Sequence, residues 1–365
     1  MAWRNRVEVS YGTLRANVAA IRKAAGERRV IAVVKADAYG LGLERCARIY
    51  HEAGVTALAV ATVGEADRVR SAVPEARVIL LGSPLPEERP LVATSGYEVF
   101  CSTLDEVQEF AHLANPVSPL PVHVHVDTGM GRFGALPEDA IGMVLEVLSW
   151  TSLRLAGIST HYPMADHEKV ANAQEEAMDD LLERLPPLPE GCLVHYANTE
   201  GLLLRPQGRA NAVRVGLLLT GIVPDGCPNI GVKPAVRWVS SLSLIKRLPA
   251  GHGVSYNHTK RLERDSVIGI VPVGYADGYP IGLSNKGNVL VQGIRCPILG
   301  RVTMDYLIVD LTDLAFPPAP GEGVVLFGGQ GSEQVTVSDM ARLAGTIPYD
   351  VLCGLRGRCE VVGVP

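Results

Sequence analysis

Aromatic residues are scarce in this chain of 365 residues, at 5%, and its basic residues form no run. Charged residues make up 20% of the chain, and the formal net charge is −5. A protein that binds nucleic acid concentrates positive charge on one face, because it must neutralise a row of phosphates. The composition therefore argues against nucleic acid as the main partner.

Long apolar runs are also missing from the sequence. No stretch reaches the roughly 20 residues that a transmembrane helix needs, and the N-terminal segment MAWRNRVEVSYG has no apolar core of signal-peptide length. The seven cysteines form no Cys-x-x-Cys pair and are odd in number, which is typical of reduced thiols in the cytosol. We therefore expect a cytoplasmic protein without a membrane partner.

Hydrophobic residues make up 47% of the chain, enough to bury a sizeable core. Over the first two thirds, short β-rich runs alternate with helical stretches. The expected strands are 29–34, 57–61, 77–81, 97–101, 122–126, 153–159, 192–196 and 212–215. The expected helices are 11–25, 43–53, 64–72, 104–113, 137–148, 169–185 and 199–204. Eight strands in this alternation, within roughly 220 residues, favour a (β/α)8 TIM-type barrel over an open doubly wound sheet.

The pattern changes near Lys233, where strand-like runs separated by glycine and proline turns begin. These runs are 236–246, 266–273, 289–291, 297–299, 306–311, 323–327 and 360–362. Only 337–343 looks helical, and the alternating run 7–9 near the N-terminus could pair with this part. We therefore predict an α/β chain of two domains. The barrel would span 10–232, and a mostly β domain would span 233–365 together with 1–9.

Polar residues stand out at the ends of the predicted barrel strands, where barrel enzymes carry their chemistry. Lys35 follows an apolar strand in IAVVKADAYG, a position where burial lowers the pKa of an amine and allows it to form a Schiff base. By position alone, Lys35 equally fits a lysine that extends from the rim of the barrel. Arg132 follows the fifth strand, and its guanidinium could hold a carboxylate.

The last three barrel strands end in further polar or glycine positions. They are His161 in GISTHYPMAD, Asn198 and Thr199 in HYANTEG, and Arg214 and Gly216 in NAVRVGLLLTG. The loops after strands seven and eight usually bind phosphate in barrels, and a hydroxyl beside exposed N–H groups suits a phosphate dianion. A lysine, a phosphate-like loop pair, two arginines and a histidine on one rim together indicate an active site.

Two other patterns have weaker interpretations. The segment GMGRFG at 129–134 matches G-x-G-x-x-G, but the next strand has no acidic residue for a dinucleotide ribose. His123, His125 and Asp127 share one strand face, and a buried polar network inside the barrel is favoured there over a metal site.

The second domain holds four segments with tyrosine or acidic residues in loops. These are Tyr256 in GHGVSYNHT, Tyr275 in VPVGYADGYP, Met304 and Asp305 in GRVTMDYLIVD, and Tyr349 in TIPYDVL. Taken together, the chain resembles the alanine racemase family, which consists of fold-type III pyridoxal 5'-phosphate (PLP) enzymes with a barrel and a β domain. The blocks AVVKADAYG, VDTGMGRFG, THYPMAD, HYAN, VRVG, GVSYN, VGYADGYP and GRVTMD match the family in order, over nearly the whole chain.

The resemblance implies a PLP cofactor and a role for each matching residue. Lys35 would carry the cofactor and act as one acid/base, and Tyr256 of the partner subunit would be the acid/base on the opposite face. Arg132 and the Met304 backbone would hold the substrate carboxylate. The residues expected around the cofactor are Lys35, Tyr39, His161, Asn198, Thr199, Arg214, Gly216, Leu217 and Tyr349.

Within that set, Arg214 would face the pyridine nitrogen, and its permanent charge would leave that nitrogen unprotonated. His161 would bridge Arg214 and Tyr256, and Asn198 would line the pocket. The phosphate would be bound by Tyr39, Thr199, Gly216, Leu217 and Tyr349. Tyr275 and Asp305 would shape the entrance. The resemblance implies interconversion of L- and D-alanine, no metal, and a homodimer, because Tyr256 and Met304 act in the partner's site.

Several positions depart from the family pattern. His125 stands where many members carry a carbamylated lysine that orients the substrate arginine, and a histidine cannot carry that group. Thr303 replaces a frequent cysteine, and Ile281 replaces an arginine after GYADGYP. Thr199 keeps the hydroxyl of a common serine, and Thr220 replaces a tyrosine. The substitutions at 281 and 303 bear on strict alanine specificity more than on the reaction type.

Three alternatives remain open at this point. The first is a serine or broad-specificity amino-acid racemase with the same chemistry. The second is a fold-type III decarboxylase, which Arg214 argues against because those enzymes face the pyridine nitrogen with an acid. The third is a non-enzymatic PLP-binding barrel, which the additional β domain argues against.

Overall fold

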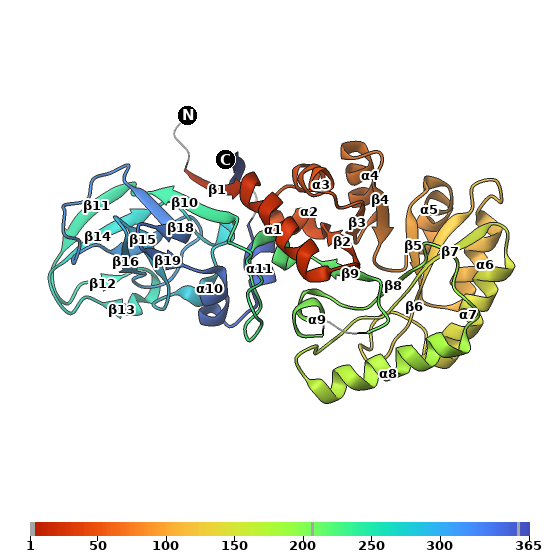
Figure 1. Ribbon diagram of the computed structural model, residues 1–365. Coiled ribbons are helices and arrows are strands. Elements are labelled where there is room, and N and C mark those ends of the chain that lie inside the picture. The colour runs from red at the N-terminus through yellow and green to blue at the C-terminus, as the bar shows by residue number, and fades with distance from the viewer. Residues whose placement is uncertain (1–3, 206–207, 356–357) are drawn as a thin grey trace.

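The computed structural model describes residues 4–205, 208–355 and 358–365 (Figure 1). Eight parallel strands close a barrel in it. They are β2 (Arg29–Val33), β3 (Ala57–Val60), β4 (Arg77–Leu80), β5 (Glu98–Cys101), β6 (Leu120–His125), β7 (Leu153–Ser159), β8 (Leu193–His195) and β9 (Ala212–Val215). Strand β2 pairs with both β3 and β9, which closes the ring. The predicted (β/α)8 barrel is confirmed.

Helices cover the outside of the barrel (Figure 1). They are α1 (Tyr11–Ala25), α3 (Leu43–Glu52), α4 (Val63–Ala72), η1 (Pro86–Glu88), α5 (Arg89–Ser95), α6 (Leu104–Leu113), α7 (Pro137–Ser149), α8 (Glu168–Arg184), α9 (Thr199–Leu204) and η2 (Leu217–Thr220). Ser10, Thr62 and Thr103 begin α1, α4 and α6, because each hydroxyl accepts a hydrogen bond from an N–H of the first turn. Helix α5 was not predicted, since seven residues are too few to show a period.

The turn after the first barrel strand has an unusual conformation. The segment α2 (Lys35–Gly40) contains four consecutive non-glycine residues with φ between 53° and 59°, from Ala36 to Tyr39. Left-handed backbone costs an L-residue about 1–2 kcal/mol, so surrounding contacts must hold this turn in place. The sequence predicted no helical element here.

The second part of the chain is mostly β (Figure 1). Its strands form sheets in the orders β16-β15-β18-β10-β1-β20, with β19 on β18, then β11-β14-β17 and β12-β13. Their bounds are β1 (Asn5–Ser10), β10 (Val236–Ser241), β11 (Leu244–Leu248), β12 (Gly253–Val254), β13 (Lys260–Arg261), β14 (Ser266–Val271), β15 (Asn288–Val291), β16 (Ile294–Pro297), β17 (Leu307–Asp310), β18 (Gly323–Gln330), β19 (Glu333–Val335) and β20 (Glu360–Val364). Strand β1 pairs with β10 and β20, so the expected pairing of 7–9 with this part is confirmed.

Two predictions for this part were wrong. The run 236–246 is two strands in different sheets, because the chain turns a corner at Leu242, whose N–H donates to the Glu322 carbonyl. The run 297–299 lies mostly beyond β16, which ends at Pro297. Helical structure is also more extensive than expected. The additional segments are η3 (Tyr256–His258), η4 (Tyr275–Asp277), η5 (Ile281–Leu283) and α11 (Pro348–Cys353), beside α10 (Val337–Ala344).

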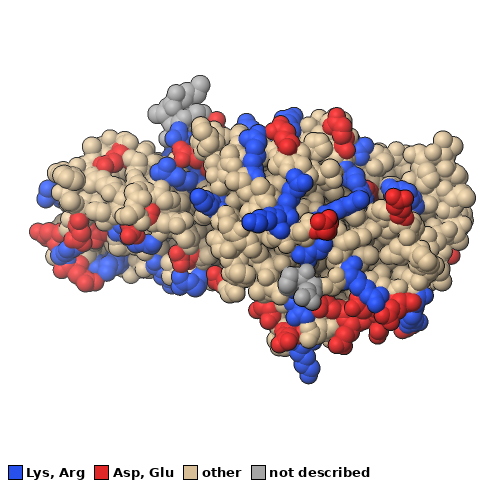
Figure 2. Space-filling view, in the orientation of Figure 1, with Lys and Arg blue, Asp and Glu red and all other residues tan. Residues whose placement is uncertain are grey.

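One large hydrophobic cluster runs from the barrel into the second part, where Trp238 packs against Tyr279 and Phe327. Figure 2 shows acidic side chains along the edge formed by α8 and basic side chains over the middle of the same face. Among the described residues, no helix is both long and apolar enough to cross a membrane.

Asn17 joins the barrel to the segment that enters the second part. Its Nδ2 donates to the carbonyls of Leu219, at 3.1 Å, and Lys233, at 2.8 Å, and its Oδ1 accepts from the Lys233 N–H at 2.8 Å. The side chain is buried. We predict that Asn17→Ala lowers the free energy of unfolding by about 3 kcal/mol, because three backbone groups lose their partner. Urea denaturation measures this change.

Asn229→Ala is the matched control, since exposed Asn229 forms, among the described residues, hydrogen bonds only within its own turn, to Val232 and Gly231. We expect it to cost less than about 1 kcal/mol. Equal losses in the two variants would mean that the Asn17 contacts do not connect the two parts energetically.

Candidate active site

A cavity of about 400 Å³ lies among the carboxyl ends of the barrel strands. Nine residues that the sequence singled out line it together. They are Lys35, Tyr39, Arg132, His161, Asn198, Thr199, Arg214, Gly216 and Tyr349. Residues far apart in the chain thus meet at one end of the barrel.

Lys35 begins the left-handed turn that follows β2. The Ala36 N–H donates to the Glu65 carboxylate at 2.6 Å, and the Leu43 N–H donates to the Asp37 carboxylate at 3.1 Å. Arg68 pairs with Asp37 at 2.6 Å from the outer side. These bonds hold the strained turn and therefore the backbone of Lys35.

The amine of Lys35 lies in an environment that disfavours its charge. Burial lowers the pKa of Lys35, and the positive charge of Arg132 lowers it further. A larger fraction of the amine is therefore neutral than at an exposed lysine. A neutral amine can act as a nucleophile or as a base.

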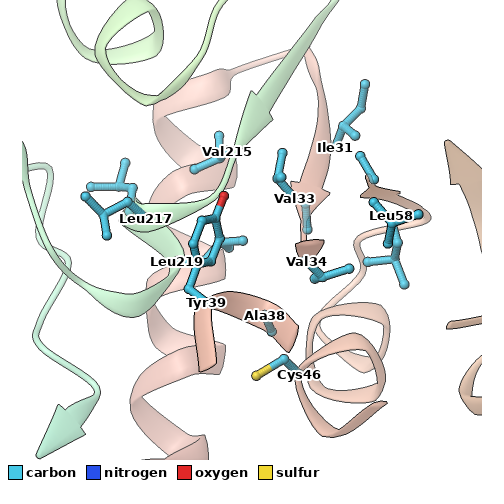
Figure 3. Packing of buried hydrophobic residues seen from close by; sticks show 14 of the residues in the cluster. Ile31, Val33, Val34, Ala38, Tyr39, Cys46, Leu58, Val215, Leu217 and Leu219 are labelled. Atoms are coloured by element: carbon cyan, nitrogen blue, oxygen red, sulfur yellow. The ribbon is translucent and has the colours of Figure 1, made fainter. Parts of the chain in front are cut away.

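Tyr39 ends the turn with its ring buried against the last barrel strand. In Figure 3 the ring lies between Val33 and Leu217. A Cβ at Gly216 would come within 2.0 Å of the Tyr39 hydroxyl, so only glycine fits there. The ring of Tyr349 lies 5.8 Å from that of Tyr39. Burial raises the pKa of Tyr39, so its hydroxyl keeps its proton and can donate a hydrogen bond.

Arg214 is buried, and both of its terminal nitrogens donate to neighbouring acceptors. Nη1 donates to the carbonyl and Nδ1 of His195, at 2.6 and 2.7 Å. Nη2 donates to the Thr160 carbonyl at 2.7 Å and to His161 Nδ1 at 3.0 Å. Burial, with the nearby charge of Arg132, lowers the pKa of Arg214 to about 10. The guanidinium therefore stays charged at neutral pH.

His125 is the last residue of β6, and Arg132 lies in the loop that follows this strand. The Arg132 guanidinium lies 5.9 Å from the Phe133 ring centre. In the described part of the chain, no acidic side chain forms an ion pair with it. His125 shares a hydrogen bond of 2.8 Å with Ser159, and burial, then the charges of Arg214 and Arg132, lowers its pKa to about 3. Arg132 is therefore a cation without a local counter-ion, which suits an anionic ligand.

The loop after β8 supplies the next part of the wall. The Asn198 side chain accepts a hydrogen bond from the Gly201 N–H at 2.8 Å, which begins α9. Thr199 is buried beside it. Leu217 follows Gly216, but its buried side chain does not line the cavity.

Four predicted site residues lie elsewhere, in the second part of the chain. Tyr256, Met304 and Tyr275 are 67%, 52% and 42% exposed, and none of them lines the cavity of their own chain. Asp305 bonds to Arg358 at 2.7 Å. The structure therefore does not bring these four residues to Lys35 within one chain.

The cavity also has walls that the sequence did not reveal. They are Val33, Ala61, Leu81, Gly82, Ser83, Phe100 and Phe133, which are mostly apolar and offer no chemical signature. Position alone could have indicated them, because Ala61 and Leu81 directly follow the barrel strands β3 and β4. His125, which the family resemblance placed near the substrate arginine, also lines the cavity.

The chain matches two family models, "Alanine racemase, N-terminal domain" over residues 9–224 and "Alanine racemase, C-terminal domain" over residues 235–362. An alanine racemase of Methylacidiphilum infernorum is 34% identical, over 96% of this chain and 90% of that protein.

Two solved structures share the architecture. The alanine racemase of E. faecalis superimposes with a TM-score of 0.92, at 32% identity, over 99% of both chains. The alanine racemase of Bartonella henselae, solved with covalently bound pyridoxal phosphate, has a TM-score of 0.90 at 28% identity, over 99% of both chains. The resemblance seen in the motifs thus extends to both halves of the sequence and to the fold, and the chain belongs to the alanine racemase family of enzymes.

Proposed function

We propose that this chain is a PLP-dependent racemase that interconverts L- and D-alanine. The observation that carries the proposal is the cavity in which Lys35, with its lowered pKa, lies among the cations Arg132 and Arg214. The relatives named alanine racemase support alanine as the substrate.

The residues around the cavity fit PLP. The volume of about 400 Å³ is in the range of small-molecule sites. Lys35 offers an amine, and the hydroxyls of Tyr39, Thr199 and Tyr349 with the backbone at Gly216 and Leu217 offer donors for a phosphate. The missing side chain at Gly216 leaves the space that Tyr39 and a close ligand need. Asn198 would line the same pocket.

When bound, PLP would supply a carbonyl carbon for amines and a ring that withdraws electrons from the α-carbon of the substrate. The residues of the chain would hold the cofactor and the substrate and would move the protons. Lys35, whose pKa is lowered by burial, would hold the cofactor and then move a proton at one face of the α-carbon.

Racemisation also needs an acid/base on the opposite face. Tyr256 is the residue proposed for it, and its exposure of 67% and its absence from the cavity of its own chain support a role in a second copy. The exposed Met304 and Tyr275 belong to the same part of the chain. We therefore propose a homodimer in which Tyr256 and Met304 complete the partner's site, with Tyr275 and Asp305 at its entrance.

Arg214 and His161 would control charge beside the cofactor ring. Arg214 remains cationic, and a neighbouring cation disfavours a proton on the ring nitrogen. Burial, followed by the charge of Arg214, lowers the pKa of His161 to about 3. His161 is therefore neutral and accepts from Arg214 through Nδ1, which leaves Nε2–H to donate to the partner's Tyr256.

Arg132 would hold the substrate carboxylate, together with the Met304 backbone of the partner. Because neutral His125 cannot replace a negatively charged support, Arg132 is less restrained than a paired arginine. This observation, with the exposed Ile281, favours one second candidate, a serine or broad-specificity amino-acid racemase.

We also retain, as proposals, a cytoplasmic location and a division into a barrel domain over 10–232 and a β domain over 233–365 with 1–9. The composition supports the first. The closed barrel of β2 to β9 and the pairing of β1 with β10 support the second.

The direct test compares L-alanine with L-serine on purified protein that absorbs visible light through bound PLP. We expect loss of optical rotation at least about tenfold faster for L-alanine, since the unfavourable placement of one hydroxyl costs at least about 1.4 kcal/mol. Comparable rates would favour the broad-specificity racemase. Visible absorption without any turnover would contradict both candidates.

Lys35→Ala tests the cofactor lysine. We expect loss of the visible absorption of lysine-bound PLP and a fall of at least about a thousandfold in racemisation, because one group serves as both anchor and acid/base. Absorption spectra and polarimetry measure the two effects. Lys260→Ala, which removes a half-buried lysine paired with Glu263, should leave both unchanged. An unaltered spectrum in Lys35→Ala would remove this residue from its role.

Tyr256→Phe tests the second acid/base and the shared site together. The variant should bind PLP, lose racemisation by about a thousandfold, and keep solvent exchange of the α-proton from one enantiomer only. Tyr97→Phe, whose hydroxyl bonds to Asp67 outside the site, is the control.

Mixing inactive Lys35→Ala and Tyr256→Phe subunits should restore activity, because a mixed dimer has one site with both groups intact. Random exchange forms mixed dimers as about half of the population, so we expect about a quarter of unaltered activity. Absence of recovery after confirmed subunit exchange would place Tyr256 outside the partner's site.

A further inference from the structure

A line of polar side chains crosses the interior of the barrel and ends at Arg214. Arg77 on β4 pairs with Glu98 on β5, at 2.6 and 2.9 Å. Glu98 contacts His123 Nε2 on β6 at 2.7 Å, and His123 Nδ1 lies 2.8 Å from His195 Nε2 on β8. His195 Nδ1 in turn lies 2.7 Å from Arg214 Nη1 on β9. These contacts account for His123, which has no other assigned role.

The direction of each hydrogen bond in this line follows from its two ends. Arg214 can only donate, so His195 Nδ1 must accept and the proton of that ring must lie on Nε2. His195 then donates to His123 Nδ1, and His123 carries its own proton on Nε2. That proton points at Glu98, which as a carboxylate can only accept. Every donor between Arg214 and Glu98 therefore points toward Glu98.

The charges agree with this order. Burial lowers the pKa of His195 and of His123, so both rings are neutral. Burial opposes the ionisation of Glu98, but hydrogen bonds from His123 and Arg77 outweigh it and hold the pKa of Glu98 at about 2. The negative charge of the line therefore lies on Glu98.

Packing fixes the two rings as well. Phe100 stacks on His123 with centroids 5.5 Å apart and contacts His195 at 5.8 Å. A Cβ at Gly157 would come within 2.3 Å of His123 Nδ1, so this ring occupies space that only glycine leaves open. Neither ring can turn over without disturbing its neighbours.

We propose that Glu98 is a positioning residue that sets, through His123 and His195, the orientation of Arg214 toward the cofactor ring. The proposal rests on the function proposed above. With Nη1 and Nη2 held by the barrel, Nε of Arg214 is the nitrogen left for a ligand, and no described residue accepts a hydrogen bond from it. If His195 carried its proton on Nδ1 instead, two donors would face each other and push the guanidinium into the cavity.

Neutron diffraction on deuterated crystals of the PLP-loaded enzyme tests the order of donors directly. We expect deuterium on Nε2 of both His123 and His195 and none on Nδ1 of either ring. Deuterium on Nδ1 of His195, or on both nitrogens of either ring, would overturn the inference. This readout needs no turnover, so an enzyme with these tautomers that racemises nothing would contradict only the proposed function.

Glu98→Gln tests whether Glu98 acts on Arg214 through the two histidines. Arg77 needs an acceptor, so the amide oxygen should turn to Arg77 and the amide NH2 to His123, which reverses both tautomers. We expect the absorption maximum of bound PLP to shift and kcat to fall by about tenfold, with KM within about twofold, because Arg214 loses one charge-assisted hydrogen bond.

Glu175→Gln is the matched control. Glu175 also accepts two bonds from one arginine, Arg205, at 3.0 and 2.8 Å, and a third from Tyr162 at 2.6 Å, but outside the barrel interior. It should lower stability without moving the spectrum or kcat. Equal spectra and equal kcat values in Glu98→Gln and the unaltered enzyme would overturn the inference. If Glu98→Gln fails to fold, the neutron measurement of the tautomers decides the question.

Discussion

The buried charge of Arg214 constrains more of this molecule than any other single group. A guanidinium removed from water needs an acceptor for its N–H groups, and unpaired ones are costly. The acceptors here are carbonyls at Thr160 and His195 and ring nitrogens of His161 and His195. They come from the ends of β7 and β8, so one side chain on β9 ties three neighbouring strand ends together. The loops that leave those ends carry Asn198 and Gly216 into the cavity.

A second constraint acts just after β2, the strand that pairs with β9 and closes the barrel. The left-handed turn from Ala36 to Tyr39 is unfavourable by itself, yet it aims Lys35 and Tyr39 at one cavity. The carboxylate of Glu65 holds the start of this turn, and the close approach of Tyr39 to Gly216 joins its end to β9. Lysine and arginine are therefore placed by adjacent strands whose contacts depend on each other.

Sequence reasoning found the eight barrel strands because short apolar runs alternate with helical stretches. It found Lys35 and Arg214 because each is a charged residue at or near the end of such a run. It could not find the turn at Ala36, since alanine has no preference that signals positive φ. Nor could it pair Glu98 with His123, because such contacts depend on the stagger between neighbouring strands, and the register of β5 on β6 places Phe100 rather than Glu98 opposite His123. The corner at Leu242 was missed because an alternating pattern continues through it.

The separation of the site residues into two groups has a physical consequence. In one chain the cavity holds Lys35, which we propose as one acid/base, while Tyr256 and Met304, which we propose for the partner's site, lie exposed on the second part. Exposed apolar and aromatic side chains gathered near functional loops favour burial against another surface. In the proposed homodimer, the contact that buries these side chains also completes the site. Lys35 and Tyr256 then belong to different subunits of this dimer. Each can approach its own face of the substrate, and neither has to cross the plane of the substrate.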